Sequence, residues 1–261
     1  MPKAFWKGVI SFGLVAIPVK MYVGAESKSI SFHMLHKKCL TRPKQVLHCD
    51  VDDEYFSSKD TVRGYEVAKG QFVVVEDKDL EKVPIRTARS IDILGFVDAN
   101  DIDPLYYYNV HYVEPEDLGA KPFCLLKEAL VKTGRAGIAK VSFARREHLG
   151  CLRPLGDILL LHTLHYEDEV HPYQEITPPQ PAYTDAEFNM ALNLVKAMAR
   201  DFNPKEYKDE YEAALKKLVE AKIAGRKIIV PEIPKTEIGD LMAALRESVK
   251  AAKKEPVLSK A

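Results

Sequence analysis

The most basic stretch of the sequence lies between residues 132 and 154, and its side chains could bind phosphate. It holds six Lys or Arg against a single acid, Glu147. Guanidinium groups donate several hydrogen bonds in a fixed planar fork, which suits phosphate oxygens. An alternative is that these charges only keep an exposed strand edge from aggregating. The cations of this stretch that we expect to contact phosphate are Lys132, Arg135, Arg145, Arg146 and Arg153.

The first 48 residues form a second basic segment. They hold eight Lys or Arg against one acid, Glu26. A cluster of cations on one part of a chain is the usual footprint of a polyanionic partner. The cations that we expect to contact phosphate here, together with one from the following segment, are Lys7, Lys20, Lys28, Lys37, Lys38, Arg42, Lys44 and Arg63.

The charge of the whole chain argues in the other direction. Its 261 residues contain 38 basic and 38 acidic side chains, so the formal net charge is zero, and a neutral chain would normally argue against a nucleic-acid partner. The acids are segregated, however: residues 76–117 hold eleven acids and four bases, and residues 166–187 hold six acids and no Lys or Arg. A neutral protein with segregated charge can present one positive and one negative face.

Histidines and cysteines between residues 33 and 49 raise the possibility of a zinc site. Imidazole and thiolate are the ligands that zinc prefers, and His36, Cys39, His48 and Cys49 supply two of each. The sequence lacks the CxxC pairs that make such a prediction strong. We therefore expect no metal and no other cofactor. In the simpler interpretation His33 packs under a strand while His36 lies near phosphate or solvent.

The sequence contains no recognisable catalytic constellation. It has no GxSxG, HExxH or P-loop motif and no paired metal carboxylates. Cys49 beside His48 and Cys151 beside His148 are only neighbours in sequence, which does not make a catalytic pair. We therefore expect no catalytic residues and no enzymatic activity. Two alternatives stay open: a lyase that attacks abasic ends through a lysine near the N-terminus, and a nucleic-acid-binding scaffold without end specificity.

Strands dominate the elements that must position the basic side chains. Residues 5–24 are expected to form two short strands that bend at Ala16–Pro18, and residues 138–161 a hairpin that turns at Gly156 and Asp157. One helix is expected over residues 121–133, with Gly134 at its C-terminal cap. Residues 25–70 are polar and short of long apolar runs. The sequence predicts an α+β fold, mainly β, with an inserted excursion in a body of about 170 residues.

Helices follow a proline-rich segment at residues 171–181. A capping box at Thr184–Glu187 opens a helix to Arg200, a second helix runs from about residue 205 to 224, and a third from 236 to 253. The first two carry apolar stripes that this part of the chain does not cover, and such patches usually mark a partner surface. The residues expected at a homodimer interface are Phe188, Leu192, Val195, Phe202, Tyr207, Tyr211, Leu215 and Leu218.

Composition also bears on location. No apolar run approaches the roughly 18 residues of a membrane helix, and the N-terminus lacks the features of a signal peptide. Four cysteines in a chain of this length do not resemble a disulfide framework. We expect a cytoplasmic protein with no membrane partner.

Several long segments together resemble the prokaryotic Ku proteins. They include FWKGVISFGLVAIPVKMY, VRGYEVAKGQFVVVEDKDLE, LLKEALVKTGRAGIAKV running into RREHLGCLRPLGDILLLHTLHYEDEV, and FNPKEYKDEYEAALKKLVEAKIAG. The resemblance covers residues 4–226 in order, and motifs of this length are far more specific than a short pattern.

The resemblance implies a fold and a function. It implies a β-barrel over residues 1–170, with a bridge inserted at about 25–80 that arches over DNA. A helical arm at 171–226 would embrace the partner subunit, and 227–261 would be a short ligase-docking region. The implied protein is a nucleoid-associated homodimer that closes a ring around the end of a double-stranded DNA. It would protect and bridge the ends and recruit an ATP-dependent DNA ligase for non-homologous end joining.

Overall fold

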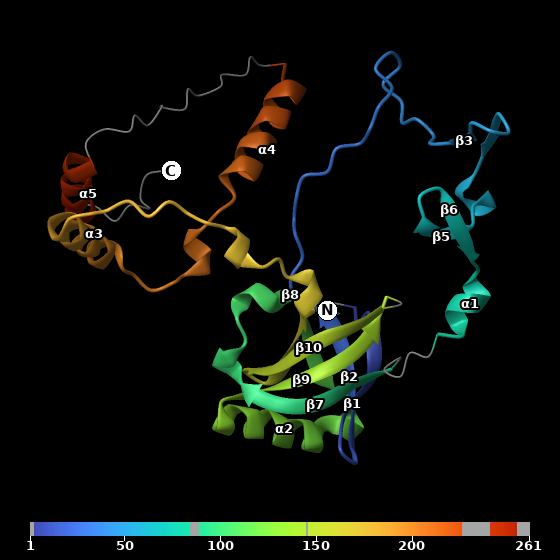
Figure 1. Ribbon diagram of the computed structural model, residues 1–261, viewed down its shortest axis with the longest axis horizontal. Coiled ribbons are helices and arrows are strands. Elements are labelled where there is room, and N and C mark those ends of the chain that lie inside the picture. The colour runs from blue at the N-terminus through green and yellow to red at the C-terminus, as the bar shows by residue number, and fades with distance from the viewer. Residues whose placement is uncertain (1–2, 84–88, 145, 226–240, 255–261) are drawn as a thin grey trace. The chain divides into compact units, whose positions relative to one another are not determined.

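The computed structural model of the protein describes residues 3–83, 89–144, 146–225 and 241–254. The chain divides into two compact units, Met1–Tyr173 and Gln174–Ala261, each described here by itself (Figure 1). None of the helices in the described part of the chain is both long and apolar enough to cross a bilayer.

The first unit contains a closed β-barrel. Around the barrel the strands follow in the order β1 (Trp6–Phe12), β2 (Val15–Val23), β8 (Tyr107–Pro115), β11 (Ile158–Leu164), β10 (Arg146–Leu155), β9 (Arg135–Phe143) and β7 (Ser90–Asp98). β7 closes the barrel by pairing with β1 in parallel, whereas the other neighbours pair antiparallel. The predicted α+β class with a β-barrel is confirmed.

Alternation along the strands fills the barrel with apolar side chains. Ile17, Val19 and Met21 of β2 are fully buried, while the residues between them are only partly covered, as expected for a strand with one face on the core. Helix α2 (Ala120–Thr133) lies along the barrel, below it in Figure 1. Its Phe123, Leu126 and Leu130 join the same apolar core. Gly134, at φ 66°, ends this helix as predicted.

A second, smaller cluster lies on the opposite side of the same strands. Cys151 and Leu164 belong to it, and Ile102 and Tyr107 pack against it. Cys151 follows Gly150 and precedes Leu152, which is part of the main core, so the two side chains of residues 151 and 152 point to opposite faces. His162 pairs with Cys151 across the ladder, and its ring meets that of Tyr107 at 4.9 Å.

Two details of the predicted β structure are wrong. The first two strands turn at Gly13, which adopts φ 56°, and not at Ala16–Pro18. Pro18 instead lies inside β2. The pairing of β2 with β8 begins only at the next residue, Val19. The N–H group that proline lacks therefore interrupts no bond between β2 and β8. Residues 135–164 form three consecutive strands and not one hairpin, because the chain also turns at Ala144, φ 52°. The turn at Gly156 is confirmed.

The excursion between β2 and β7 has small elements of its own. It contains two hairpins, β3 (Leu47–Cys49) with β4 (Glu54–Phe56) and β5 (Arg63–Ala68) with β6 (Gln71–Val75), followed by α1 (Asp77–Glu81). In the described ranges no strand of the barrel pairs with these four. Residues 24–46 contain no strand and His33 is exposed, so the interpretation in which His33 packs under a strand is wrong.

The second unit contains α3 (Asp185–Met198), α4 (Glu210–Ile223) and α5 (Leu241–Lys254). The capping box of α3 forms as predicted: the Glu187 N–H donates to the Thr184 hydroxyl, and the Glu187 carboxylate accepts from the Thr184 N–H. α4 begins later than predicted, because Asp209 caps it after a 3-10 turn at Pro204–Glu206. α5 packs against α3.

The histidines of the barrel should make its stability depend on pH. Burial, and then the charge of Arg153, lower the pKa of His162 from 6.5 to about 4, and burial also lowers the pKa of His111 and His148. The unfolded chain therefore binds more protons below its pKa of 6.5, and stability falls as the pH drops from 6.5 toward 4. We expect His162 alone to cost about 2 kcal/mol of unfolding free energy between pH 7 and 5. Urea unfolding at each pH measures the free energy of unfolding.

The variant His162→Asn should unfold with a shallower pH dependence over the same range. The matched control is His171→Asn, because His171 is exposed and its loss should leave the slope unchanged. Equal slopes in wild type and His162→Asn would contradict the prediction.

Candidate nucleic-acid interface

Five of the predicted phosphate-binding cations lie on the irregular part of the excursion. Residues 24–46 form no helix and no strand, and Lys28, Lys37, Lys38, Arg42 and Lys44 are all exposed there. Throughout the described residues none of the five forms an ion pair with a carboxylate. Their charges are therefore open to an external anion, as phosphate binding requires.

A tight turn organises the centre of this segment. The His36 N–H donates to the Thr41 carbonyl at 2.8 Å, and the Leu40 N–H donates to the His36 carbonyl at 2.7 Å. The turn brings the Thr41 hydroxyl and His36 Nδ1 each within 2.9 Å of Cys39 Sγ. The Thr41 hydroxyl, and then the His36 imidazole, lower the pKa of the Cys39 thiol to about 7. From the sequence, Cys39 was considered only as a zinc ligand, and His36 as a zinc ligand or as a residue near phosphate or solvent.

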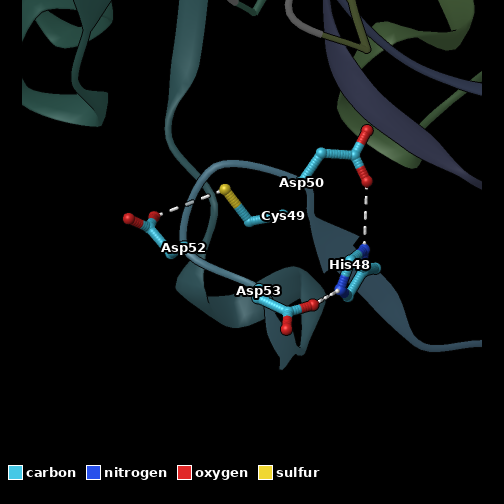
Figure 2. Close-up of polar contacts among 5 residues, drawn as sticks. All are labelled: His48, Cys49, Asp50, Asp52 and Asp53. Carbon is cyan, nitrogen blue, oxygen red and sulfur yellow. Dashed lines mark hydrogen bonds and ion pairs between the residues drawn. The ribbon is translucent and has the colours of Figure 1, made fainter.

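The second half of the considered zinc set lies in an acidic turn (Figure 2). His48 Nδ1 lies 3.1 Å from Asp50 Oδ1, and His48 Nε2 lies 3.0 Å from Asp53 Oδ1. Cys49 Sγ donates to Asp52 Oδ2 at 3.3 Å. His48 and Cys49 are thus each bonded to a carboxylate of their own turn. Among the described side chains no group of three His, Cys, Asp or Glu is arranged to hold a metal ion. A metal-free excursion stays a prediction.

The cations on the barrel are placed differently, because three of the predicted ones lie beside an acid or a carbonyl. Lys7 lies 3.8 Å from Glu116, and the Arg146 guanidinium is bonded to Glu169. Arg135 donates to the Phe96 carbonyl at 3.4 Å. Lys132 is exposed at the end of α2 and Lys20 is half-buried on β2. Arg145 lies outside the described residues.

Two further predicted contacts have local partners. In the excursion, Arg63 Nη1 donates to Asp77 Oδ1 at 2.6 Å and ties β5 to the start of α1. On the barrel, the guanidinium carbon of Arg153 lies 5.6 Å from the centre of the Tyr107 ring. Arg153 is half-buried, so its guanidinium packs on the Tyr107 ring beside the small apolar cluster and is only partly open to a ligand.

The residues predicted at a homodimer interface are mostly exposed. Phe188, Leu192 and Val195 form one stripe of α3 and are 53%, 39% and 67% exposed. The half-buried residues of α3 lie on another stripe, which includes Met190 and Leu194, and α5 packs against α3. Phe202, Tyr207 and Tyr211 are exposed, while Leu215 and Leu218 are half-buried on α4.

Comparison with known proteins decides the family. The model of the Ku70/Ku80 beta-barrel domain matches residues 11–190. A non-homologous end joining protein Ku from Solibacter usitatus is 42% identical over 253 residues, which cover 97% of this chain and 95% of that protein. The protein of the same name from Archaeoglobus fulgidus is 38% identical over 254 residues, which cover 96% of this chain and all of that protein.

This chain belongs to the Ku family. The Ku barrel match begins inside β1 and reaches into α3, so it includes the whole excursion. A Ku protein from Frankia casuarinae is 39% identical over 254 residues, but this chain spans 64% of its length. α4 and α5 lie beyond the matched barrel domain.

Glu169, which pairs with the predicted phosphate contact Arg146, was not identified from the sequence. Glu169 bonds to Arg146, which lies 23 residues earlier in the chain. The only sequence signal was the acidic run Glu167, Asp168, Glu169, which gives no indication of the side chain that it meets. Pairing across such a distance follows from the fold.

The chemistry of Cys39 gives a prediction for this turn. Because the pKa of its thiol is about 7, alkylation of Cys39 by iodoacetamide should reach half its maximal rate near pH 7. Mass spectrometry of the Cys39 peptide over pH 5.5 to 9.5 measures the profile. Thr41→Val removes the largest contribution and should shift the midpoint upward. Buried Cys151, whose pKa is raised by burial, is the internal control and should react only slowly. A Cys39 profile still rising near pH 9 would contradict the prediction.

Proposed function

We propose that this protein binds the ends of double-stranded DNA without reading their sequence, as a homodimer that protects and bridges the ends in non-homologous end joining. The observation that carries the proposal is the row of exposed cations with no acidic partner among the described residues, at positions 28–44 of a Ku-family chain. The relatives with most of their length matched are named for non-homologous end joining.

The form of the basic segment supports contact with phosphates and not with bases. Base readout in the major groove requires an element that enters the groove, usually a helix. The cations at 28–44 lie on chain without helix or strand. Phosphate contacts need no such element and carry no sequence information. A protein that must bind any broken DNA end, whatever its sequence, requires contacts of this kind.

The two apolar stripes of α3 support the homodimer. α5 packs against α3, whose half-buried stripe includes Met190 and Leu194, whereas the stripe of Phe188, Leu192 and Val195 stays exposed. A helix that is apolar on two sides needs two partners. A second copy of the chain is the natural second partner for a ring that closes around DNA.

We also propose that the protein recruits an ATP-dependent DNA ligase and has no enzymatic activity of its own. The ligase-docking region proposed at residues 227–261 falls largely outside the described residues. Its described part, α5, packs with α3, and the half-buried residues Met242, Leu245 and Val249 form one stripe of α5. The solvent side of α5, with Arg246 and Lys250, is the part left for a ligase to contact.

Charge reversal in the excursion tests the DNA interface. If the dimer neutralises about six to ten phosphates, log affinity should fall against log salt with a slope of roughly −5 to −9. The variant Lys37→Glu/Lys38→Glu should bind weakly to every end sequence alike, and its slope should be shallower by about 2 per protomer. Fluorescence anisotropy with labelled duplexes of different terminal sequence measures both quantities.

The matched control reverses two exposed lysines of the acidic half of the same excursion. Lys59→Glu/Lys69→Glu makes the same change in net charge, and both residues are exposed, so this variant should bind like the wild type. A loss that depended on the terminal sequence, or an equal loss in both variants, would contradict the proposed interface.

Substitution of the exposed α3 stripe tests the homodimer. Leu192→Asp/Val195→Asp places two charges on the surface proposed to be buried between subunits, and should convert a dimer at micromolar concentration into monomers. Sedimentation equilibrium measures the mass. Asn193→Asp is the control, because Asn193 is exposed on the same helix outside that stripe. A wild-type monomer at micromolar concentration would rule out the proposed dimer.

A further inference from the structure

A single carboxylate accepts two hydrogen bonds at the edge of the barrel and lies close to a histidine. Glu169 accepts from the Arg146 guanidinium, which comes from the first residue of β10. It also accepts from the Tyr166 N–H at 3.0 Å, and His165 Nδ1 lies 3.6 Å from its Oε2. Glu169 is therefore held in place by the backbone of its own turn, unlike a glutamate that moves freely on a surface.

The turn that carries Glu169 is a fixed element. Glu167–Glu169 form a 3-10 turn, and the bond from the Tyr166 N–H to Glu169 closes it in the manner of a capping box. The bond to Arg146, and then the bond to the Tyr166 N–H, lower the pKa of Glu169. The carboxylate thus keeps its negative charge at neutral pH and stays aimed at the guanidinium.

Arg146 nevertheless remains open to solvent. Its side chain is 57% exposed, compared with 32% for Glu169. A guanidinium group has five N–H donors, so a second anion can approach the same group from the solvent side. Any such anion would meet the negative charge of Glu169, and that of its exposed neighbours Glu167 and Asp168.

We infer that Glu169 competes with DNA phosphate for Arg146 and so limits the affinity of the protein for DNA. This inference rests on the proposed function, because it takes Arg146 to be a phosphate contact. Carboxylate and phosphate are both anionic acceptors for the same donor fork. DNA binding at this site must either displace Glu169 from Arg146 or place a phosphate next to a carboxylate, and both cost affinity.

The pair has little to contribute to folding. Ion pairs between exposed side chains typically stabilise proteins only weakly, and the Tyr166 N–H can be satisfied equally well by an amide oxygen. The variant Glu169→Gln removes the charge and keeps an acceptor of the same shape. It should therefore fold like the wild type, and a change in DNA affinity would report on the competition.

The test is a double-mutant cycle on full-length protein with a linear, fluorescently labelled duplex. Glu169→Gln should bind about twofold to fivefold more tightly than the wild type, the range expected when an exposed ion pair no longer competes. Its salt slope should be steeper by up to about 1 per protomer, because each subunit neutralises one further phosphate. Arg146→Gln should bind more weakly. In the Arg146→Gln background the Glu169→Gln substitution should have no effect.

The matched control is Glu167→Gln, which removes the same charge from the same exposed turn without touching a residue bonded to Arg146. It should gain clearly less affinity than Glu169→Gln. Thermal unfolding of each variant checks that the fold is retained, and Glu169→Asn supplies a second neutral replacement if the glutamine variant is unstable.

The outcomes separate the inference from the function on which it rests. Equal gains in both glutamine variants would mean that only bulk charge matters, and would overturn the inference. So would weaker binding by Glu169→Gln, which would mean that Glu169 orients Arg146 for DNA, or a gain that persists without Arg146. A wild-type protein that binds no DNA would overturn the proposed function itself, and the inference with it.

Discussion

Closure of the barrel is the constraint on which the rest of the first unit depends. β7 returns to β1 through the parallel register of Val9 with Ser90 and Ile10 with Ile91. The chain leaves the barrel at the end of β2, after Val23, and re-enters it at the start of β7, at Ser90. Because β1 lies between β2 and β7, the two ends of the excursion lie on the two strands that flank β1. The excursion is thus an insertion whose two ends join strands of the same barrel. A basic segment tethered at both ends is well suited to pass around a ligand and return.

Distribution of charge explains how a neutral chain can bind a polyanion. On the barrel, several cations meet acids; for example, Lys140 lies 2.8 Å from Glu147, and Arg146 is bonded to Glu169. In the irregular part of the excursion, the cations of residues 28–44 are exposed and have no acidic partner among the described residues. Five exposed cations without a described acidic partner therefore lie close together in sequence on the inserted segment, although the total charge of the chain is zero. The acids that pair with arginines of the barrel then determine how much those arginines can contribute to the affinity for DNA.

Local signals predicted the local structure. Gly134 ended α2 and the Thr184–Glu187 box opened α3, because a cap is decided by residues within one turn of the helix. The sequence did not reveal the turn at Ala144, since a non-glycine residue at φ 52° gives no compositional signal. Nor did it reveal the Arg146–Glu169 pair, or that α3 has one half-buried and one exposed apolar stripe. Both features depend on how distant segments pack. The long motifs indicated the Ku family where periodicity alone gave only a β-rich body.

The central claim is that the protein recognises a DNA end and not merely duplex DNA. The most direct measurement is competition for a labelled linear duplex by two unlabelled DNAs of identical sequence and length, one linear and one covalently closed. A dimer that must be threaded onto an end should be displaced efficiently by the linear competitor and poorly by the circle, and cutting the circle once should restore competition. Equal competition by the linear and closed DNAs at the same salt concentration would contradict the account.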